Sequence, residues 1–175
     1  MEIKRGIVFS SPSGGAFGFV PDWAKMVAIT APYTVTKTGY FIGAYGLNDF
    51  TVVVNGVSSA CFGNIITTVP VFAGDVISVV PQYAFYVPPS SVKIGRLNVS
   101  AAVELPAGSV MPTSGAVVFV PSSSTQAASS AIINGNEVAP LGTTTLSPIY
   151  ISKGATVSAS NPDWIDHLIF YPFKS

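Results

Sequence analysis

The residue types that most often perform acid–base or nucleophilic catalysis are scarce in this chain of 175 residues. It contains one histidine, His167, and one cysteine, Cys61. Asp166 directly precedes the histidine, so on a strand its carboxylate would point to the opposite face and could not orient the imidazole. We therefore expect His167 to be an exposed or hydrogen-bonded strand residue and not part of a catalytic triad.

The remaining reactive groups also lack the neighbours that catalysis requires. Cys61 has no histidine or basic residue nearby in the sequence to activate its thiol, and a single cysteine excludes an internal disulfide. No His/Cys cluster of the metal-binding kind occurs, and the acidic residues are scattered as on any soluble surface. We expect a buried thiol, no cofactor, no metal and no enzymatic activity. The acids considered as a glycoside-cleaving pair are Asp22, Asp49, Asp75, Glu104, Glu137, Asp163 and Asp166.

Two tryptophans occur in the same short motif. Pro21-Asp22-Trp23 recurs as Pro162-Asp163-Trp164. Each tryptophan could stack on a sugar in one of two sites, or each motif could be a turn capped by its aspartate, with the tryptophan covering one end of the sandwich core. We favour the second interpretation because large aromatic residues commonly close barrels and sandwiches.

Composition restricts the partners of the chain. Eight basic and eight acidic residues cancel, only 9% of the residues are charged, and no basic cluster exists beyond Lys4-Arg5. This argues against nucleic acid as a partner. Before Pro, Gly or Asp interrupts them, the apolar runs are too short for a membrane-spanning helix, and no secretory signal is readable. With so little charge, part of the surface is expected to be covered by further copies of the chain.

The sequence contains an internal repeat. Three features of the first half return in the second: Asn55-Gly56 as Asn134-Gly135, Gly74 as Gly154, and Thr38-Gly39 as Ser114-Gly115. Neither half is long enough to bury its apolar faces alone. We therefore predict a duplicated strand-turn-strand unit.

Short runs of Val, Ile, Phe, Tyr and Thr alternate with 16 glycines and 14 prolines. This pattern predicts an all-β protein, an antiparallel jelly-roll-like β-sandwich with little or no helix. We predict an arm and first strand over residues 1–26 and a sandwich over residues 27–175. The sandwich would consist of repeat 1 (28–90), a connecting strand segment (91–107) and repeat 2 (108–175).

Two local predictions follow from turn chemistry and alternation. Asn55-Gly56 and Asn134-Gly135 predict type I′ hairpin turns, because both residue types tolerate positive φ. The segment Leu97 to Val103 alternates as a strand with one solvent-exposed face does.

The order of several motifs resembles β-rich domains of tailed-phage virion proteins, namely tail-fibre tips, receptor-binding proteins and related head-fibre or decoration proteins. The resemblance implies a β-sandwich, commonly a homotrimer, on the surface of the particle. If the sequence is a complete gene product, its short N-terminal arm implies direct docking on other virion proteins. The motifs are Pro21-Asp22-Trp23, Ile29 to Val35, Thr38-Gly39-Tyr40, Val53 to Gly56, Val71 to Asp75 and the closing Phe170-Tyr171-Pro172.

The leading hypothesis is a non-enzymatic tail-fibre or baseplate component that is made in the host cytoplasm, assembles on the virion and binds a host glycan or receptor by avidity. The alternatives are a capsid decoration or head-fibre protein, and a carbohydrate-binding or adhesin domain. Contacts are expected in loops and near turns. The candidate contact residues are Tyr45, Asn48, Asp49, Tyr83, Gln126, Asn136 and Glu137.

Overall fold

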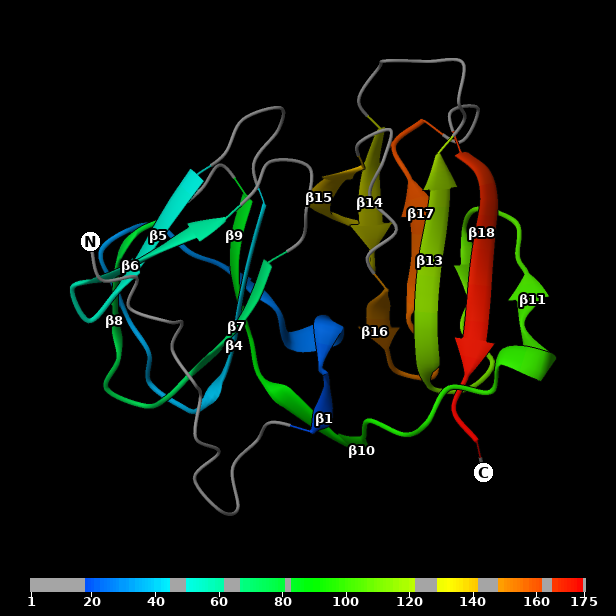
Figure 1. The fold of residues 1–175 in the computed structure, drawn as a ribbon, viewed down its shortest axis with the longest axis horizontal. Coiled ribbons are helices and arrows are strands. Elements are labelled where there is room, and N and C mark those ends of the chain that lie inside the picture. Colours follow the sequence, from blue (N-terminus) through cyan, green and yellow to red (C-terminus); the bar gives the residue numbers. More distant parts are fainter. Residues whose placement is uncertain are drawn as a thin grey trace, which may run out of the picture.

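The fold is that of a computed structural model, which describes residues 18–44, 50–61, 67–80, 83–121, 129–141, 148–161 and 165–174. Antiparallel strands dominate these residues, and the helical content consists of two single 3-10 turns (Figure 1). Within the described ranges, no helix is long and apolar enough to cross a membrane. The prediction of an all-β antiparallel sandwich is confirmed.

The first half of the chain forms a sandwich of two four-stranded sheets, with strand orders β2-β9-β4-β7 and β3-β8-β5-β6. We call it the first sandwich. Its strands are β2 (Val27–Ala28), β3 (Tyr33–Thr34), β4 (Gly39–Ala44), β5 (Phe50–Val54), β6 (Val57–Cys61), β7 (Thr67–Val71), β8 (Val76–Val79) and β9 (Tyr83–Val87).

The second half forms a second sandwich with the orders β11-β18-β13-β16 and β12-β17-β14-β15. Its strands are β11 (Val103–Glu104), β12 (Ser109–Val110), β13 (Gly115–Pro121), β14 (Ser129–Ile133), β15 (Asn136–Leu141), β16 (Ile149–Ile151), β17 (Thr156–Ala159) and β18 (Ile165–Pro172).

The two strand orders are the same once each strand is matched to its counterpart, β2 to β11 through β9 to β18. The register agrees as well, since Val27 lies opposite Tyr86 in one sandwich and Val103 lies opposite Phe170 in the other. Each repeat therefore completes its own pair of sheets in jelly-roll order, whereas the sequence suggested one sandwich shared by both halves. The structural repeat also includes part of the predicted connecting segment, residues 91–107, because β11 is the counterpart of β2.

One strand of a short two-stranded ribbon precedes each sandwich. β1 (Phe19–Pro21) pairs with β10 (Pro89–Lys93), which connects the two halves (Figure 1). The 3-10 turn η1 (Trp23–Lys25) leads into β2, and η2 (Val99–Ala101) leads into β11. The prediction of a continuous strand over Leu97 to Val103 is therefore wrong. Leu97 forms an isolated bridge to Phe173, and the chain then turns before β11 begins.

The two Asn-Gly turns adopt the predicted conformation. Asn55 and Asn134 both have φ of 51°, and the glycine that follows each also has positive φ. Each asparagine side chain accepts a hydrogen bond from a neighbouring strand, Asn55 Oδ1 from the Val76 amide at 2.8 Å and Asn134 Oδ1 from the Thr156 amide at 3.0 Å. The side chains thus fix the same hairpin in both sandwiches.

In sheet β2-β9-β4-β7, the central strands β4 and β9 are buried on both faces. Phe41 and Tyr86 pack in the core inside the first sandwich. Ile42 and Phe85, which alternate with them, belong to a larger cluster that includes the core of the second sandwich. Strand residues alternate between faces, so the apolar run in β4 reflects a strand covered on both sides. The two sandwiches are therefore packed against each other.

Candidate functional site

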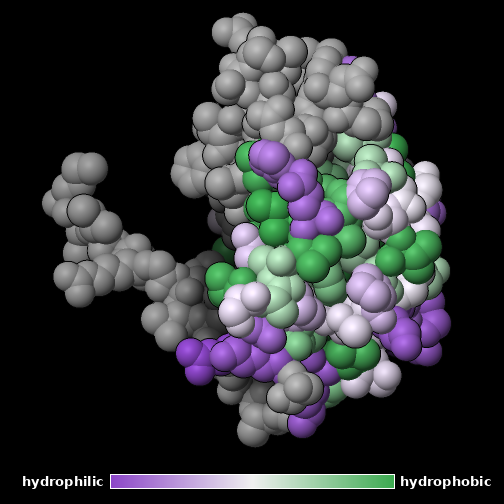
Figure 2. All heavy atoms as spheres, turned by 90° about the vertical axis from the view of Figure 1, so that its right-hand side faces the viewer, coloured by the Kyte–Doolittle hydropathy of each residue, from purple (hydrophilic) through white to green (hydrophobic). Residues whose placement is uncertain are grey.

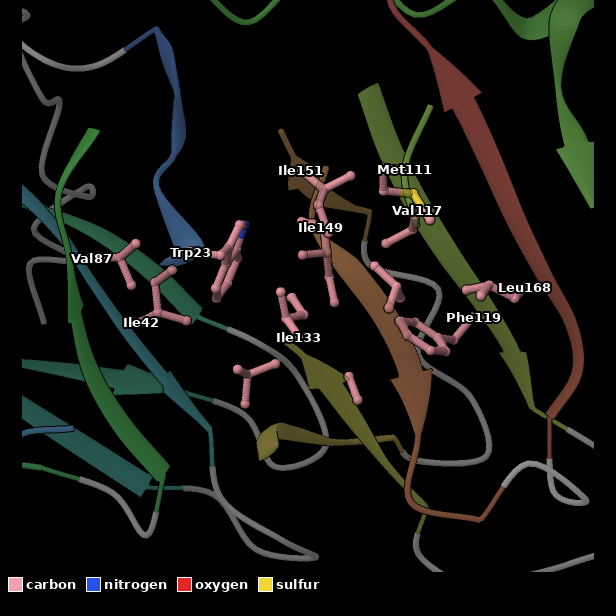
Figure 3. Packing of buried hydrophobic residues seen from close by; sticks show 14 of the residues in the cluster. Trp23, Ile42, Val87, Met111, Val117, Phe119, Ile133, Ile149, Ile151 and Leu168 are labelled. Carbon is pink, nitrogen blue, oxygen red and sulfur yellow. The ribbon is translucent and has the colours of Figure 1, made fainter. Parts of the chain in front are cut away.

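The junction between the sandwiches is organised by Trp23. Its side chain is only 3% exposed and lies between Val87 and Ile42 of the first sandwich and Ile149 of the second (Figure 3). The indole Nε1 donates a hydrogen bond to the Tyr150 carbonyl oxygen at 2.7 Å. Because the ring fills the junction and its polar atom is satisfied, Trp23 closes the core as the favoured interpretation predicted.

The recurring Pro-Asp-Trp motif is not a structural repeat. The counterparts of Asp22 and Trp23 are Asn98 and Val99, since both pairs open a 3-10 turn with closely similar backbone angles. Trp164 lies outside the described residues. The burial of Trp23 agrees with the favoured interpretation, but Asp22 forms no side-chain hydrogen bond that caps the turn, so the expected Asp cap is wrong. The motif does not predict a pair of equivalent sites.

A groove of about 430 Å³ opens beside Trp23, between η1 and two turns of the second sandwich. Its walls combine an indole edge with amide, hydroxyl, carboxylate and ammonium groups. Ser152 Oγ in this wall is buried and finds no hydrogen-bond partner among the described residues. The groove is lined by Asp22, Trp23, Ala24, Met26, Asn134, Asn136, Ser152, Lys153, Gly154 and Ala155.

The charges around the groove are arranged at its rim. Asp22 Oδ2 accepts from Lys25 Nζ at 2.6 Å, and Lys25 is largely exposed. Lys153 is also exposed, and the Asn136 amide donates to the Asn134 carbonyl oxygen at 3.3 Å. The lining combines hydrogen-bond donors and acceptors of both charges with apolar side chains, so the groove suits an uncharged polyhydroxylated ligand better than a phosphate or a strongly charged peptide.

A second cross-sandwich contact lies nearby. The Tyr83 hydroxyl donates to Glu137 Oε1 at 3.0 Å. Burial raises the pKa of Tyr83 above its usual value, and the hydrogen bond and charge of Glu137 raise it further. Tyr83 is consequently a neutral donor at physiological pH, and the contact joins β9 to β15.

The structure describes three of the seven predicted contact residues and brings them to this junction. Asn136 lines the groove, while Tyr83 and Glu137 bond to each other. The other four, Tyr45, Asn48, Asp49 and Gln126, lie outside the described residues. Sequence reasoning missed the groove residues Ser152 and Lys153. Their signal was the turn at Gly154, which is equivalent to the turn at Gly74.

An apolar pocket of about 210 Å³ lies on another side of Trp23. Tyr40 forms part of its wall, and its hydroxyl donates to the Phe19 carbonyl oxygen at 2.6 Å. Burial, the largest influence, raises the pKa of Tyr40. The pocket is lined by Pro21, Trp23, Tyr40, Thr68, Ile94, Pro148, Ile149 and Tyr150.

Asp22, one of the acids considered for catalysis, lines the groove, but the single histidine lies elsewhere. His167 Nδ1 is 2.7 Å from Glu104 Oε1 on the surface formed by β18 and β11, and both side chains are exposed. Cys61 ends β6, and its side chain is outside what the structure describes, as are Asp49 and Asp163. Among the described residues, no three His, Cys, Asp or Glu side chains cluster as metal ligands.

Comparison of the chain with protein-family models, with curated proteins and with solved structures finds no match in any of the three. The functional argument therefore depends on the junction itself.

Proposed function

We propose that the chain is a non-enzymatic structural protein of a bacteriophage virion, a tail-fibre or baseplate component that binds a glycan of the host surface. The observation that carries this proposal is the junction groove, where Asp22, Asn136 and Lys153 surround the edge of Trp23. Hydroxyl groups of sugars pair with such side chains, which donate and accept hydrogen bonds, whereas the Trp23 ring, only 3% exposed, is part of the wall and not a stacking surface.

The mechanism is adhesion through many weak contacts. An open groove with a few polar groups gives modest affinity, because each hydrogen bond exchanged with water contributes only about 0.5–1.5 kcal/mol. Several grooves on one particle raise the effective concentration of the ligand and convert weak binding into stable attachment.

The test measures retention of the purified, fluorescently labelled protein on host cells and on isolated host surface polysaccharide. Asn136→Ala and Lys153→Ala should each reduce binding by roughly threefold to tenfold, because each removes a polar contact. Lys93→Ala is the matched control, since Lys93 is an exposed lysine of β10 that does not line the groove. Equal losses in all three variants, or none, would contradict the groove as the binding site.

Binding assays with the same purified protein distinguish between the alternative functions. Association with phage particles that lack it, without retention on host cells, would favour a capsid decoration or head-fibre protein. Glycan binding by a chain that does not associate with particles would favour a free carbohydrate-binding or adhesin domain.

A further inference from the structure

Within the chain, one face of the first sandwich is covered by the second. The face belongs to β4 and β9, and the covering element is β15, an edge strand of the second sandwich. Ile42, Phe85 and Val87 of this face are all buried, Ile42 with only 1% exposure. Trp23 extends the contact to the edge strand β16. The result is a head-to-tail contact between unlike surfaces of two equivalent sandwiches.

The second sandwich carries the corresponding face, on β13 and β18, and among the described residues no further sandwich covers it. The counterparts of Ile42, Phe85 and Val87 are Val118, Ile169 and Tyr171, and all three are only half-buried. The difference in exposure between the two sandwiches is largest at the position next to these residues. Val99, the counterpart of Trp23, is 69% exposed. A view of the molecule from the β11 side shows hydrophobic residues gathered across the middle of this end (Figure 2).

The first sandwich carries the complementary surface, which is likewise exposed at its described residues. Its edge strand β6 is the counterpart of β15, and the turn before it corresponds to the groove wall around Asn136. Asn136 is replaced there by Val57, which is 53% exposed, and Ser152 by Phe72, which is 39% exposed. Positions that are polar at the internal junction are thus apolar on the surface.

We propose that a second copy of this chain docks on the uncovered face, with its β6 edge lying on β13 and β18 as β15 lies on β4 and β9. In this arrangement Val99 packs beside Val57 and Phe72 of the neighbour, as Trp23 shares a groove wall with Asn136 and Ser152. Apolar side chains that are individually exposed would then be buried together.

The polar groups at the same place are compatible with this contact. His167 is the counterpart of Tyr83, and Ser58 is the counterpart of Glu137, so the docked copies place an exposed serine near the His167–Glu104 pair. The chain has a formal net charge of +0, so approach of identical copies meets little long-range repulsion.

The contact joins two different surfaces, so a pair of docked copies still carries one free face and one free edge. Such heterologous contacts generate a closed ring where the rotation closes and a filament where it does not. This inference is independent of the proposed glycan binding, because the internal groove and the surface between copies consist of different residues.

The experiment measures the mass of the full chain by native mass spectrometry and sedimentation. The wild-type protein should form a higher oligomer. Val99→Glu on the face and Val57→Glu on the edge should each give monomers of 18.1 kDa, because a charge would be buried in the contact. Val27→Glu is the matched control, since this exposed valine has no place in the contact and should leave the oligomer intact.

Mixing the two monomeric variants decides between this contact and any other. Val99→Glu retains an unaltered edge, and Val57→Glu retains an unaltered face. The mixture should therefore form a one-to-one heterodimer that grows no further. A wild-type monomer at all concentrations, unchanged oligomers in both variants, or a mixture that stays monomeric would overturn the proposal. Circular dichroism confirms that each variant is folded, which is expected because both valines are exposed.

Discussion

The Tyr83 hydroxyl and the Glu137 carboxylate, from equivalent halves of a duplicated chain, are joined by a hydrogen bond of 3.0 Å across the junction. Tyr83 lies on β9 of the first sandwich and Glu137 on β15 of the second. The apolar cluster that both sandwiches share makes the junction part of the core of the protein, and this exposed contact adds a polar link across it.

We predict that the two sandwiches unfold in one cooperative transition and that Tyr83 and Glu137 are coupled. In a double-mutant cycle of Tyr83→Phe and Glu137→Gln, urea unfolding should give an interaction free energy of about 0.5–1 kcal/mol, small because the pair is partly solvated. Calorimetry checks the cooperativity. Two resolved transitions, or strictly additive variants, would contradict this account.

Trp23→Phe should destabilise the protein by about 1–3 kcal/mol, because the Tyr150 carbonyl oxygen loses its indole donor within the junction. Urea unfolding followed by circular dichroism measures the effect without relying on tryptophan fluorescence. Tyr150→Phe is the control. It leaves the backbone acceptor in place and should change the free energy of unfolding much less, and equal effects of the two substitutions would argue against the bond.

Equivalent substitutions in the two asparagine turns should lower the free energy of unfolding to a similar extent. Asn55→Ala and Asn134→Ala should each cost about 1–3 kcal/mol, because alanine tolerates positive φ poorly and cannot accept the bond from the neighbouring strand. Asn55→Gly and Asn134→Gly keep the backbone freedom and lose only the side-chain bond, so their losses should be smaller. Thermal unfolding of the four variants measures their order of stability. Glycine variants that are less stable than the alanine variants would refute this prediction.

Stability should fall at alkaline pH. Burial raises the pKa of Tyr40, so the folded state holds this proton more tightly than the unfolded state does. The resulting stabilisation is complete below the ordinary tyrosine pKa of about 10 and is lost as the pH rises through the folded value. Tyr40→Phe should therefore show a shallower decline in unfolding free energy above pH 10 than the parent, and an equally steep decline would contradict the assignment.

Local chemistry predicted much of the fold. Asn55-Gly56 and Asn134-Gly135 identified two hairpins because few residues adopt positive φ, and the glycines at 74 and 154 identified the repeat. Alternation was less informative. It suggested a strand over Leu97 to Val103, where a 3-10 turn forms, and strands of two residues such as β3 and β12 are too short to show a period.

The sequence pattern could not predict which strands and residues far apart in the chain contact each other. Identical patterns in two halves do not tell whether strands pair within a half or between halves, so the presence of two complete sandwiches could not be deduced. The groove combines Trp23 with Asn136 and Lys153 from the other half, and no local spacing links them. Asn136 was predicted only because it follows a turn.

The covering of β4 and β9 by β15 also bears on synthesis of the chain. All strands of the first sandwich precede β10, so this sandwich can complete its hydrogen-bonded sheets while the rest is still being translated. The apolar side chains of Ile42 and Phe85 nevertheless remain exposed to water until β15 has left the ribosome. During that interval the nascent protein exposes an apolar surface that chaperones and neighbouring nascent chains can bind.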